Sequence, residues 1–196
     1  MSTPIASTAL EQLFHNARTH SHWQNRPVSD ELMRQLYDLL KLCPTSANCS
    51  PARFVFIKSA EAKARLKPFL MEGNIEKTMA APVCVIVAQD QRFYEHLPAL
   101  YPHADAKSWF EGNQPVIDAT AFRNSSLQGA YLMLAARSLG LDCGPMSGFD
   151  AAGLEQEFFP DGRFKANFLV NLGYGEAGKL HARSPRFGFD EACSIL

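Results

Sequence analysis

The clearest helical pattern in the sequence lies between Ser29 and Pro44. Apolar residues recur there three or four positions apart, as one face of an α-helix requires. Ser29 is suited to cap the first turn, Asp30 and Glu31 complement the helix dipole, and Pro44 cannot continue the helix. The sequence therefore predicts a capped helix whose apolar face consists of Leu32, Met33, Leu36, Tyr37, Leu39 and Leu40.

Four short apolar segments predict strands. Residues 81–89 form a nearly continuous apolar run rich in β-branched side chains, which is typical of a strand buried on both faces. Residues 164–175 predict a second buried strand, and residues 53–58 and 143–146 predict shorter extended segments. These segments are enough for one small sheet.

Helices are predicted around these strands. The longest covers residues 118–142, and because its second half is apolar nearly all round, we expect it to cross the core. Gly140 is suited to end it. Shorter helices are predicted at residues 10–18, 59–70 and 147–159. Together the elements indicate an α+β fold with helices flanking a small sheet.

Residues 90–115 show no clean periodicity. This stretch is rich in aromatic and histidine side chains, and irregular segments of this length usually carry function or are mobile. We interpret it as a candidate lid over a binding site, with Tyr101, His103 and Trp109 as the side chains that would close it.

Composition favours one soluble domain over residues 1–196. The chain is 46% hydrophobic and 20% charged, which is ordinary for a globular domain of this length. Its formal net charge of -1 gives no global field that would attract nucleic acid or an anionic membrane. Five cysteines without a CxxC pair argue against a disulfide framework, and no targeting or membrane segment is recognised, so we expect a cytoplasmic protein.

Several common chemistries leave no motif in the sequence. We find no GxxxxGK[ST] phosphate loop, no GxGxxG, no GxSxG and no HExxH. His20 and His22 are close in sequence but would point in different directions, so we predict no metal site. Cys49 is the best candidate for a nucleophilic thiol, whereas Cys43 and Cys84 lie in apolar stretches typical of core residues.

Groups that bind anions and amides gather instead at four separated places. Each place also has a purely structural interpretation: a charged last helical turn, turn chemistry after Pro44, a Gly73–Asn74 turn, or solvated charges in the tail. The residues concerned are Arg18, Thr19 and Ser21; Thr45, Ser46 and Asn48; Asn74 and Lys77; and Arg183 and Arg186.

Taken in order, these segments resemble the FMN-dependent nitroreductase family. The resemblance rests on "PTSANCSPARFV", "GNIEK" followed by "APV", "GPMSGFD", "NLGYG" and "RSPR", and it covers most of the chain. The chain is most similar to the branch that contains the malonic semialdehyde reductase of pyrimidine degradation. The resemblance implies an α+β homodimer in which helices flank a small, mostly antiparallel sheet and FMN lies at the subunit interface.

The resemblance also implies roles for the polar clusters. Arg18 and Thr19 match the residues that contact the FMN phosphate, and Arg186, helped by Arg183, matches the C-terminal arginine that completes this clamp. Guanidinium groups suit this role because they can bind a phosphate dianion bidentately. The loop of the partner subunit that reaches the flavin matches Pro44, Thr45, Ser46 and Asn48.

The ring of FMN has its own set of matching residues. Asn74 matches the family's asparagine at the pyrimidine edge, and Lys77 follows one helical turn later, where its charge would favour the anionic reduced ring. The strip over the other face matches Pro145, Met146, Ser147 and Gly148. The chain departs from the family at Ser21, where many members carry a basic residue, and at Ser147, where several carry an acidic one.

The expected function is therefore that of an FMN-dependent NAD(P)H oxidoreductase. Its expected acceptor is malonic semialdehyde, reduced to 3-hydroxypropionate, with His103 as a candidate proton donor. The alternative is an NAD(P)H nitroreductase or quinone reductase of broad specificity, and a third hypothesis is a flavin-binding sensor or store without turnover. A carboxylate-bearing substrate needs a further cation, for which Arg53, Arg123 and Lys107 are the candidates. NADH and NADPH remain open alternatives.

Overall fold

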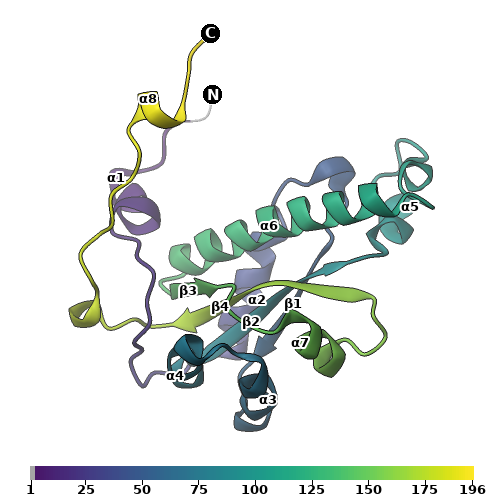
Figure 1. Cartoon of the computed structure of the whole chain (residues 1–196). Helices are drawn as coiled ribbons and strands as arrows, with labels where there is room; N and C mark the ends of the chain where they lie inside the picture. The colour runs from purple at the N-terminus through teal and green to yellow at the C-terminus, as the bar shows by residue number, and fades with distance from the viewer. Residues whose placement is uncertain (1–2) are drawn as a thin grey trace.

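A four-stranded antiparallel sheet forms the centre of the protein (Figure 1). The structure is a computed structural model and describes residues 3–196. The strand order is β1-β2-β4-β3, and each neighbouring pair runs antiparallel. All four segments predicted as strands are confirmed, and no strand end is shifted by more than two residues. The strands are β1 (Ala52–Ile57), β2 (Val83–Asp90), β3 (Asp142–Met146) and β4 (Phe164–Gly173).

The sheet is covered on both faces. All eight residues of β2 are buried, and alternate side chains of this strand enter two different apolar clusters. Val83, Val85 and Val87 pack with helices α2 (Asp30–Leu40) and α6 (Gln114–Ser138). The intervening residues of β2 pack with α3 (Ala60–Leu66) and α7 (Ala151–Phe158). This two-sided burial explains the continuous apolar run in the sequence.

Helix α2 forms as the sequence predicts. The Ser29 hydroxyl accepts a hydrogen bond of 3.1 Å from the backbone N–H of Leu32, which satisfies one of the free donors in the first turn. Helix α6 starts at Gln114, four residues earlier than predicted, with Pro115 in its first turn. A proline is tolerated there because its missing N–H would have no partner in the helix. The remaining helices are α1 (Ser7–Leu10), α4 (Glu72–Ala80), α5 (Leu97–Leu100) and α8 (Phe189–Ala192).

The N-terminal helix differs from the predicted residues 10–18. α1 continues as one π-helical turn, Glu11–His15, so that helical structure ends before Arg18. The chain then becomes extended, and Thr19 forms a parallel bridge with Cys143 beside β3. Arg18 is therefore not a residue of a last helical turn, which removes its simplest structural explanation.

Both ends of the chain leave the central body together (Figure 1). We call residues 7–19 the N-terminal arm and residues 180–192 the C-terminal arm. Arg183 in the C-terminal arm donates a hydrogen bond of 2.6 Å to the carbonyl oxygen of His15, and Arg18 donates one of 2.6 Å to the carbonyl oxygen of His181. The two arms are thus joined reciprocally by arginine side chains.

The segment after β2 is more ordered than predicted. It folds into short turns of helix, Phe93–His96, α5 and Ala106–Trp109, and these place Phe93, Leu97 and Phe110 in a small apolar cluster of their own. Helical turns of four residues are too short to produce a recognisable periodicity, which is why this segment was predicted as irregular. No helix in the described part of the chain has the length and apolar character needed to cross a membrane.

Candidate functional site

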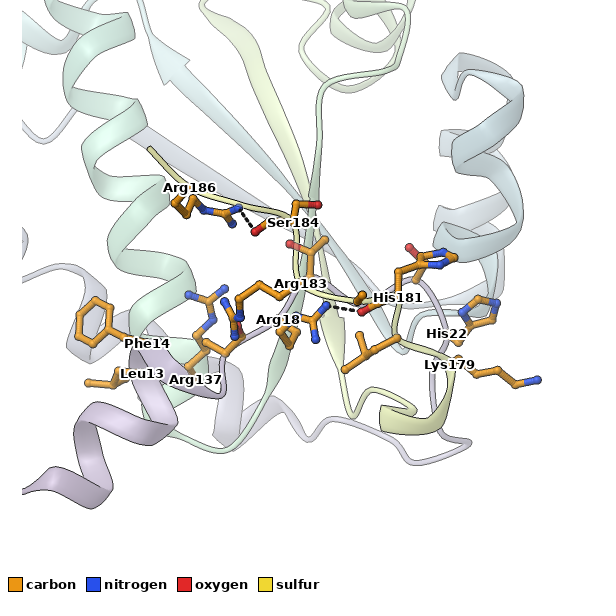
Figure 2. Close-up of a pocket in the computed structure, with 15 residues that line it drawn as sticks. Leu13, Phe14, Arg18, His22, Arg137, Lys179, His181, Arg183, Ser184 and Arg186 are labelled. Atoms are coloured by element: carbon orange, nitrogen blue, oxygen red, sulfur yellow. Dashed lines mark hydrogen bonds between the residues drawn. The ribbon is translucent and has the colours of Figure 1, made fainter. Parts of the chain in front are cut away.

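A cavity of about 420 Å³ lies between the two arms and the end of α6 (Figure 2). Five residues predicted to bind a cofactor line this cavity, although they come from opposite ends of the sequence. We call it the arginine cavity. The five residues are Arg18, Thr19, Ser21, Arg183 and Arg186.

Five further polar residues of the arginine cavity were missed by the sequence analysis: His22, Arg137, Lys179, His181 and Ser184. Arg137 lies in the last turn of α6, where a basic residue is ordinary and gives no functional signal. His22 stands within the stretch that carries Arg18, and this proximity was the one available clue. None of the described residues that line the cavity is acidic. The cavity is therefore suited to an anion.

A second cavity, of about 410 Å³, continues from the first along α4. The two share Ser21 and His22, and Lys77 and Glu76 of α4 line the second one. The position of α4 is fixed in part by Trp23, whose indole N–H donates a hydrogen bond of 3.0 Å to the carbonyl oxygen of Lys77. A cleft thus runs from the arginines to the helix that carries Asn74 and Lys77. We call this second cavity the α4 cleft.

Asn74 and the strip after β3 contact each other. The side-chain nitrogen of Asn74 donates a hydrogen bond of 2.7 Å to the carbonyl oxygen of Gly148, which also accepts one of 3.1 Å from the backbone N–H of Met71. Pro145 and Met146 are the last residues of β3, and Ser147 follows them. Gly73 and Asn74 lie inside α4, so their interpretation as a turn is wrong.

Gly148 allows this contact because it has no side chain. A Cβ atom at this position would lie 2.5 Å from the side-chain nitrogen of Asn74, closer than real contacts allow. Gly148 therefore leaves room for the Asn74 side chain where α4 approaches the end of β3.

The loop that carries Pro44, Thr45, Ser46 and Asn48 lies elsewhere. The backbone N–H of Ser46 donates a hydrogen bond of 2.8 Å to the side-chain oxygen of Asn124 in α6. Asn124 and Arg137 are separated by about 20 Å along α6, since a helix rises about 1.5 Å per residue. This loop therefore does not reach the arginine cavity of its own chain.

Three other predicted roles can be compared with the geometry. Cys49 is 1% exposed, and burial raises the pKa of its thiol to about 11, so the thiolate that a nucleophile needs is disfavoured. Arg53 donates to the buried carboxylate of Asp90 at 2.8 Å, and Lys107 pairs with Glu111 at 3.1 Å. Arg53 is thus engaged by a buried carboxylate, whereas the Lys107–Glu111 pair is exposed and weak.

His103 remains a hypothesis as a proton donor. It is exposed and contacts Tyr101 edge to face, with ring centroids 5.6 Å apart, and Trp109 packs on the same tyrosine at 6.1 Å. This aromatic group lies near the loop at residues 44–48, because Asn48 donates a hydrogen bond of 2.8 Å to the carbonyl oxygen of Leu100. His103 lines neither the arginine cavity nor the α4 cleft.

The histidines of the first polar cluster point apart, as predicted. His20 is 6% exposed, whereas His22 is exposed and lines both cavities. Among residues 3–196, no group of three or more His, Cys, Asp or Glu side chains is arranged to hold a metal ion.

Comparison with solved structures places this fold among nitroreductases. A candidate nitroreductase from Bacillus subtilis superimposes with a TM-score of 0.86 at 19% identity, covering 97% of this chain and 100% of the other. A candidate nitroreductase from Exiguobacterium sibiricum, solved in complex with FMN, superimposes with a TM-score of 0.85 at 21% identity over 100% of both chains. At these identities the agreement establishes the fold, and it confirms the predicted nitroreductase-like arrangement of helices and antiparallel sheet.

Sequence comparison gives the family. A protein of Burkholderia lata is 64% identical over 193 residues, which is 98% of this chain and 99% of that one, and it is named as a candidate NADH dehydrogenase/NAD(P)H nitroreductase. The model of the Nitroreductase family matches residues 15–174. The chain therefore belongs to the nitroreductase family.

Proposed function

We propose that this protein is an FMN-dependent NAD(P)H oxidoreductase that reduces small organic acceptors. The observation that carries the proposal is the arginine cavity, which has no acidic lining residue among those described and opens into the α4 cleft beside Lys77. The arginine cavity is suited to a phosphate dianion. The α4 cleft presents Ser21, His22 and Lys77 as donors toward a flavin ring, beside the carboxylates of Glu76 and Glu176.

The residues fit FMN in two parts. Arg18, Arg183 and Arg186 would hold the phosphate, and Thr19 adds a hydroxyl donor beside them. Asn74 and Lys77 would face the pyrimidine edge of the ring. Bound FMN would supply hydride transfer from NADH or NADPH to the acceptor, with the two substrates using one pocket in turn. FMN is named in the complex of the Exiguobacterium relative, and NAD(P)H in the name of the Burkholderia relative.

A homodimer would complete this site. The loop at residues 44–48 has exposed polar groups but lies about 20 Å along α6 from the arginine cavity of its own chain. In a second copy the same loop would be free to cover the flavin, together with the neighbouring segment that carries His103. α6 supplies an apolar surface for such an interface, since Phe122, Leu127 and Tyr131 are all more than a third exposed.

The acceptor is best proposed as a nitro compound or a quinone. The name of the Burkholderia relative refers to nitroreductase activity, and this protein covers nearly its whole length. Of the three cations considered for a substrate carboxylate, Arg53 and Lys107 are engaged by Asp90 and Glu111. Malonic semialdehyde remains the second candidate, because Arg123 on α6 is exposed and forms no salt bridge within the described residues.

An anaerobic visible spectrum of the purified protein tests these alternatives. NADH or NADPH should bleach the flavin band, and a nitroaromatic compound or a quinone should restore it. Recovery with malonic semialdehyde alone would establish the second candidate. A flavin band that neither nicotinamide bleaches would indicate a binding protein without turnover, and a protein that takes up no added FMN would refute the proposal.

The phosphate assignment has its own test. Arg18→Ala and Arg186→Ala should each fold normally and retain FMN much less tightly than the wild type. Arg34→Ala, on the exposed side of α2, removes the same charge away from the site and serves as the control. Full flavin occupancy in both site variants would show that these arginines do not hold the phosphate.

A further inference from the structure

Arg137 has a guanidinium group without a protein partner. Its Nε atom is buried and has no hydrogen-bond partner, and no salt bridge of the described residues includes its side chain. An arginine carries five N–H donors, and leaving such donors unpaired in a buried position is costly. The side chain therefore has the capacity to bind a ligand, and it lines the arginine cavity.

The three arginines already assigned to the phosphate are partly used by the protein itself. Arg18 donates to the carbonyl oxygen of His181, Arg183 donates to that of His15, and Arg186 donates to Ser184 and Pro185 in its own arm. Figure 2 shows Arg137 projecting from α6 toward Arg183. Arg137 is thus the member of this group with the most donors left for an anion.

The position of Arg137 also differs from that of the other three. They lie on the two terminal arms, whereas Arg137 belongs to the long helix that packs on the sheet. Its backbone carbonyl oxygen accepts a hydrogen bond of 2.6 Å from the side chain of Gln12 in the N-terminal arm. It lines the same cavity as Arg183 of the C-terminal arm. Arg137 therefore stands where both arms meet the body of the protein.

We propose that Arg137 is a phosphate-binding residue of this site and that the phosphate group of the cofactor joins both terminal arms to α6. This inference rests on the proposed FMN site. The phosphate would receive donors from the N-terminal arm, the C-terminal arm and the helix at once, and binding it would offset the repulsion among the four guanidinium groups. FMN would then strengthen the attachment of the arms to the body, whereas riboflavin, which lacks the phosphate, would not do so.

The affinities of FMN and riboflavin separate this role from a structural one. Arg137→Gln keeps a polar side chain of similar reach but removes the charge and the fork of donors. We expect it to weaken FMN binding by about 10- to 100-fold, the loss typical of a hydrogen bond to a charged group, with riboflavin binding unchanged. Arg137→Lys restores the charge without the fork and should recover part of the loss. Arg34→Gln is the matched control for net charge and should change neither affinity.

If Arg137→Gln weakens the binding of FMN and of riboflavin equally, Arg137 has a structural role and the inference is overturned. Unchanged FMN binding in this variant would also overturn it. A wild-type protein that binds no FMN would instead refute the proposed function itself. Hydrogen exchange of residues 180–186 gives a second readout. FMN should slow exchange in the wild type and do so less in Arg137→Gln, and equal protection in the wild type by riboflavin would contradict the role given to the phosphate.

Discussion

Asn74 and Gly148 are joined by a hydrogen bond of 2.7 Å from the asparagine side chain to the glycine carbonyl oxygen. The bond connects α4 to the end of β3, which are the two elements expected to contact the flavin ring on different sides. Because the side-chain amide nitrogen of Asn74 is engaged here, the protein itself fixes the orientation of this amide. Such preorganisation is what a site on rigid elements requires.

Gly148→Ala should disturb this contact directly. The new Cβ atom would lie 2.5 Å from the Asn74 nitrogen, so the asparagine must move and its hydrogen bond to residue 148 must weaken. We expect a folded protein with FMN affinity reduced about tenfold, as measured by fluorescence quenching, because a properly oriented amide is lost. Gly178→Ala is the control, since its Cβ would meet nothing within 4 Å. Equal affinities in the two variants would show that the position of Asn74 is unimportant for binding.

Thr78 and Asn171 form a second connection beneath α4. Both are fully buried, and the Asn171 side-chain nitrogen donates a hydrogen bond of 3.1 Å to the Thr78 hydroxyl. Thr78→Val keeps the shape but leaves this nitrogen without an acceptor, so we expect a loss of about 1–3 kcal/mol in the free energy of unfolding, measured in urea. The double variant Thr78→Val, Asn171→Leu removes both polar partners. It should recover part of the loss, and a strictly additive result would exclude the coupling.

Much of the sheet could be predicted from the sequence because burial determines the pattern. The run at residues 81–89 is apolar because β2 is covered on both faces, and the cap at Ser29 leaves a local signature of its own. The N-terminal helix was placed incorrectly because its π-helical turn, Glu11–His15, has no distinct residue preference that a helical pattern reveals. The short helical turns within residues 90–115 were not predicted for a related reason, since a turn of four residues is too short to show a helical period.

The site was predictable only in part, because its residues meet through tertiary structure. Arg18 and Arg183 are brought together by the paths of the two arms, and this pairing came from the family resemblance alone. Arg137 resembles an ordinary cation at a helix C-terminus. The residues next to it in sequence do not indicate that both terminal arms lie beside it in the fold. Residues that act together across such distances are recognised only when the fold is known.

Asp90 is a buried carboxylate that holds the segment after β2. It is 0% exposed and accepts hydrogen bonds from Arg53 at 2.8 Å and from Arg163 at 3.0 Å. Asp90→Asn would leave Arg53 without its charge partner and Arg163 with Glu95 alone. We expect a loss of about 3 kcal/mol in the free energy of unfolding. Glu157→Gln, which breaks a surface pair with Arg65, is the control and should leave the urea midpoint unchanged. A similar midpoint for both variants would show that the cluster around Asp90 contributes little.

Cysteine labelling tests the burial of the thiols. Burial raises the pKa of Cys49 to about 11 and those of Cys84 and Cys143 to about 12, and Cys43 is also buried. Because the thiolate is the reactive form, iodoacetamide at pH 8 should modify only the exposed Cys193 in the native protein. Mass spectrometry should show one added label, and none in Cys193→Ser. Rapid labelling of Cys49 in the native state would revive its role as a nucleophile.

The same burial makes stability fall at alkaline pH. A cysteine in the unfolded chain loses its proton above its ordinary pKa of 9.0, whereas Cys49 in the fold stays protonated until about pH 11. Between these values the unfolded state binds fewer protons, so the free energy of unfolding decreases as pH rises. Cys49→Ala lacks this contribution. The amount by which its free energy of unfolding lies below that of the wild type should therefore shrink by about 1 kcal/mol between pH 8 and pH 10, as measured by urea unfolding. Comparing the two proteins at each pH cancels the opposing contribution of Lys63, whose pKa is lowered by burial in both. If this difference in the free energy of unfolding is the same at pH 8 and pH 10, Cys49 ionises equally in the folded and unfolded chain.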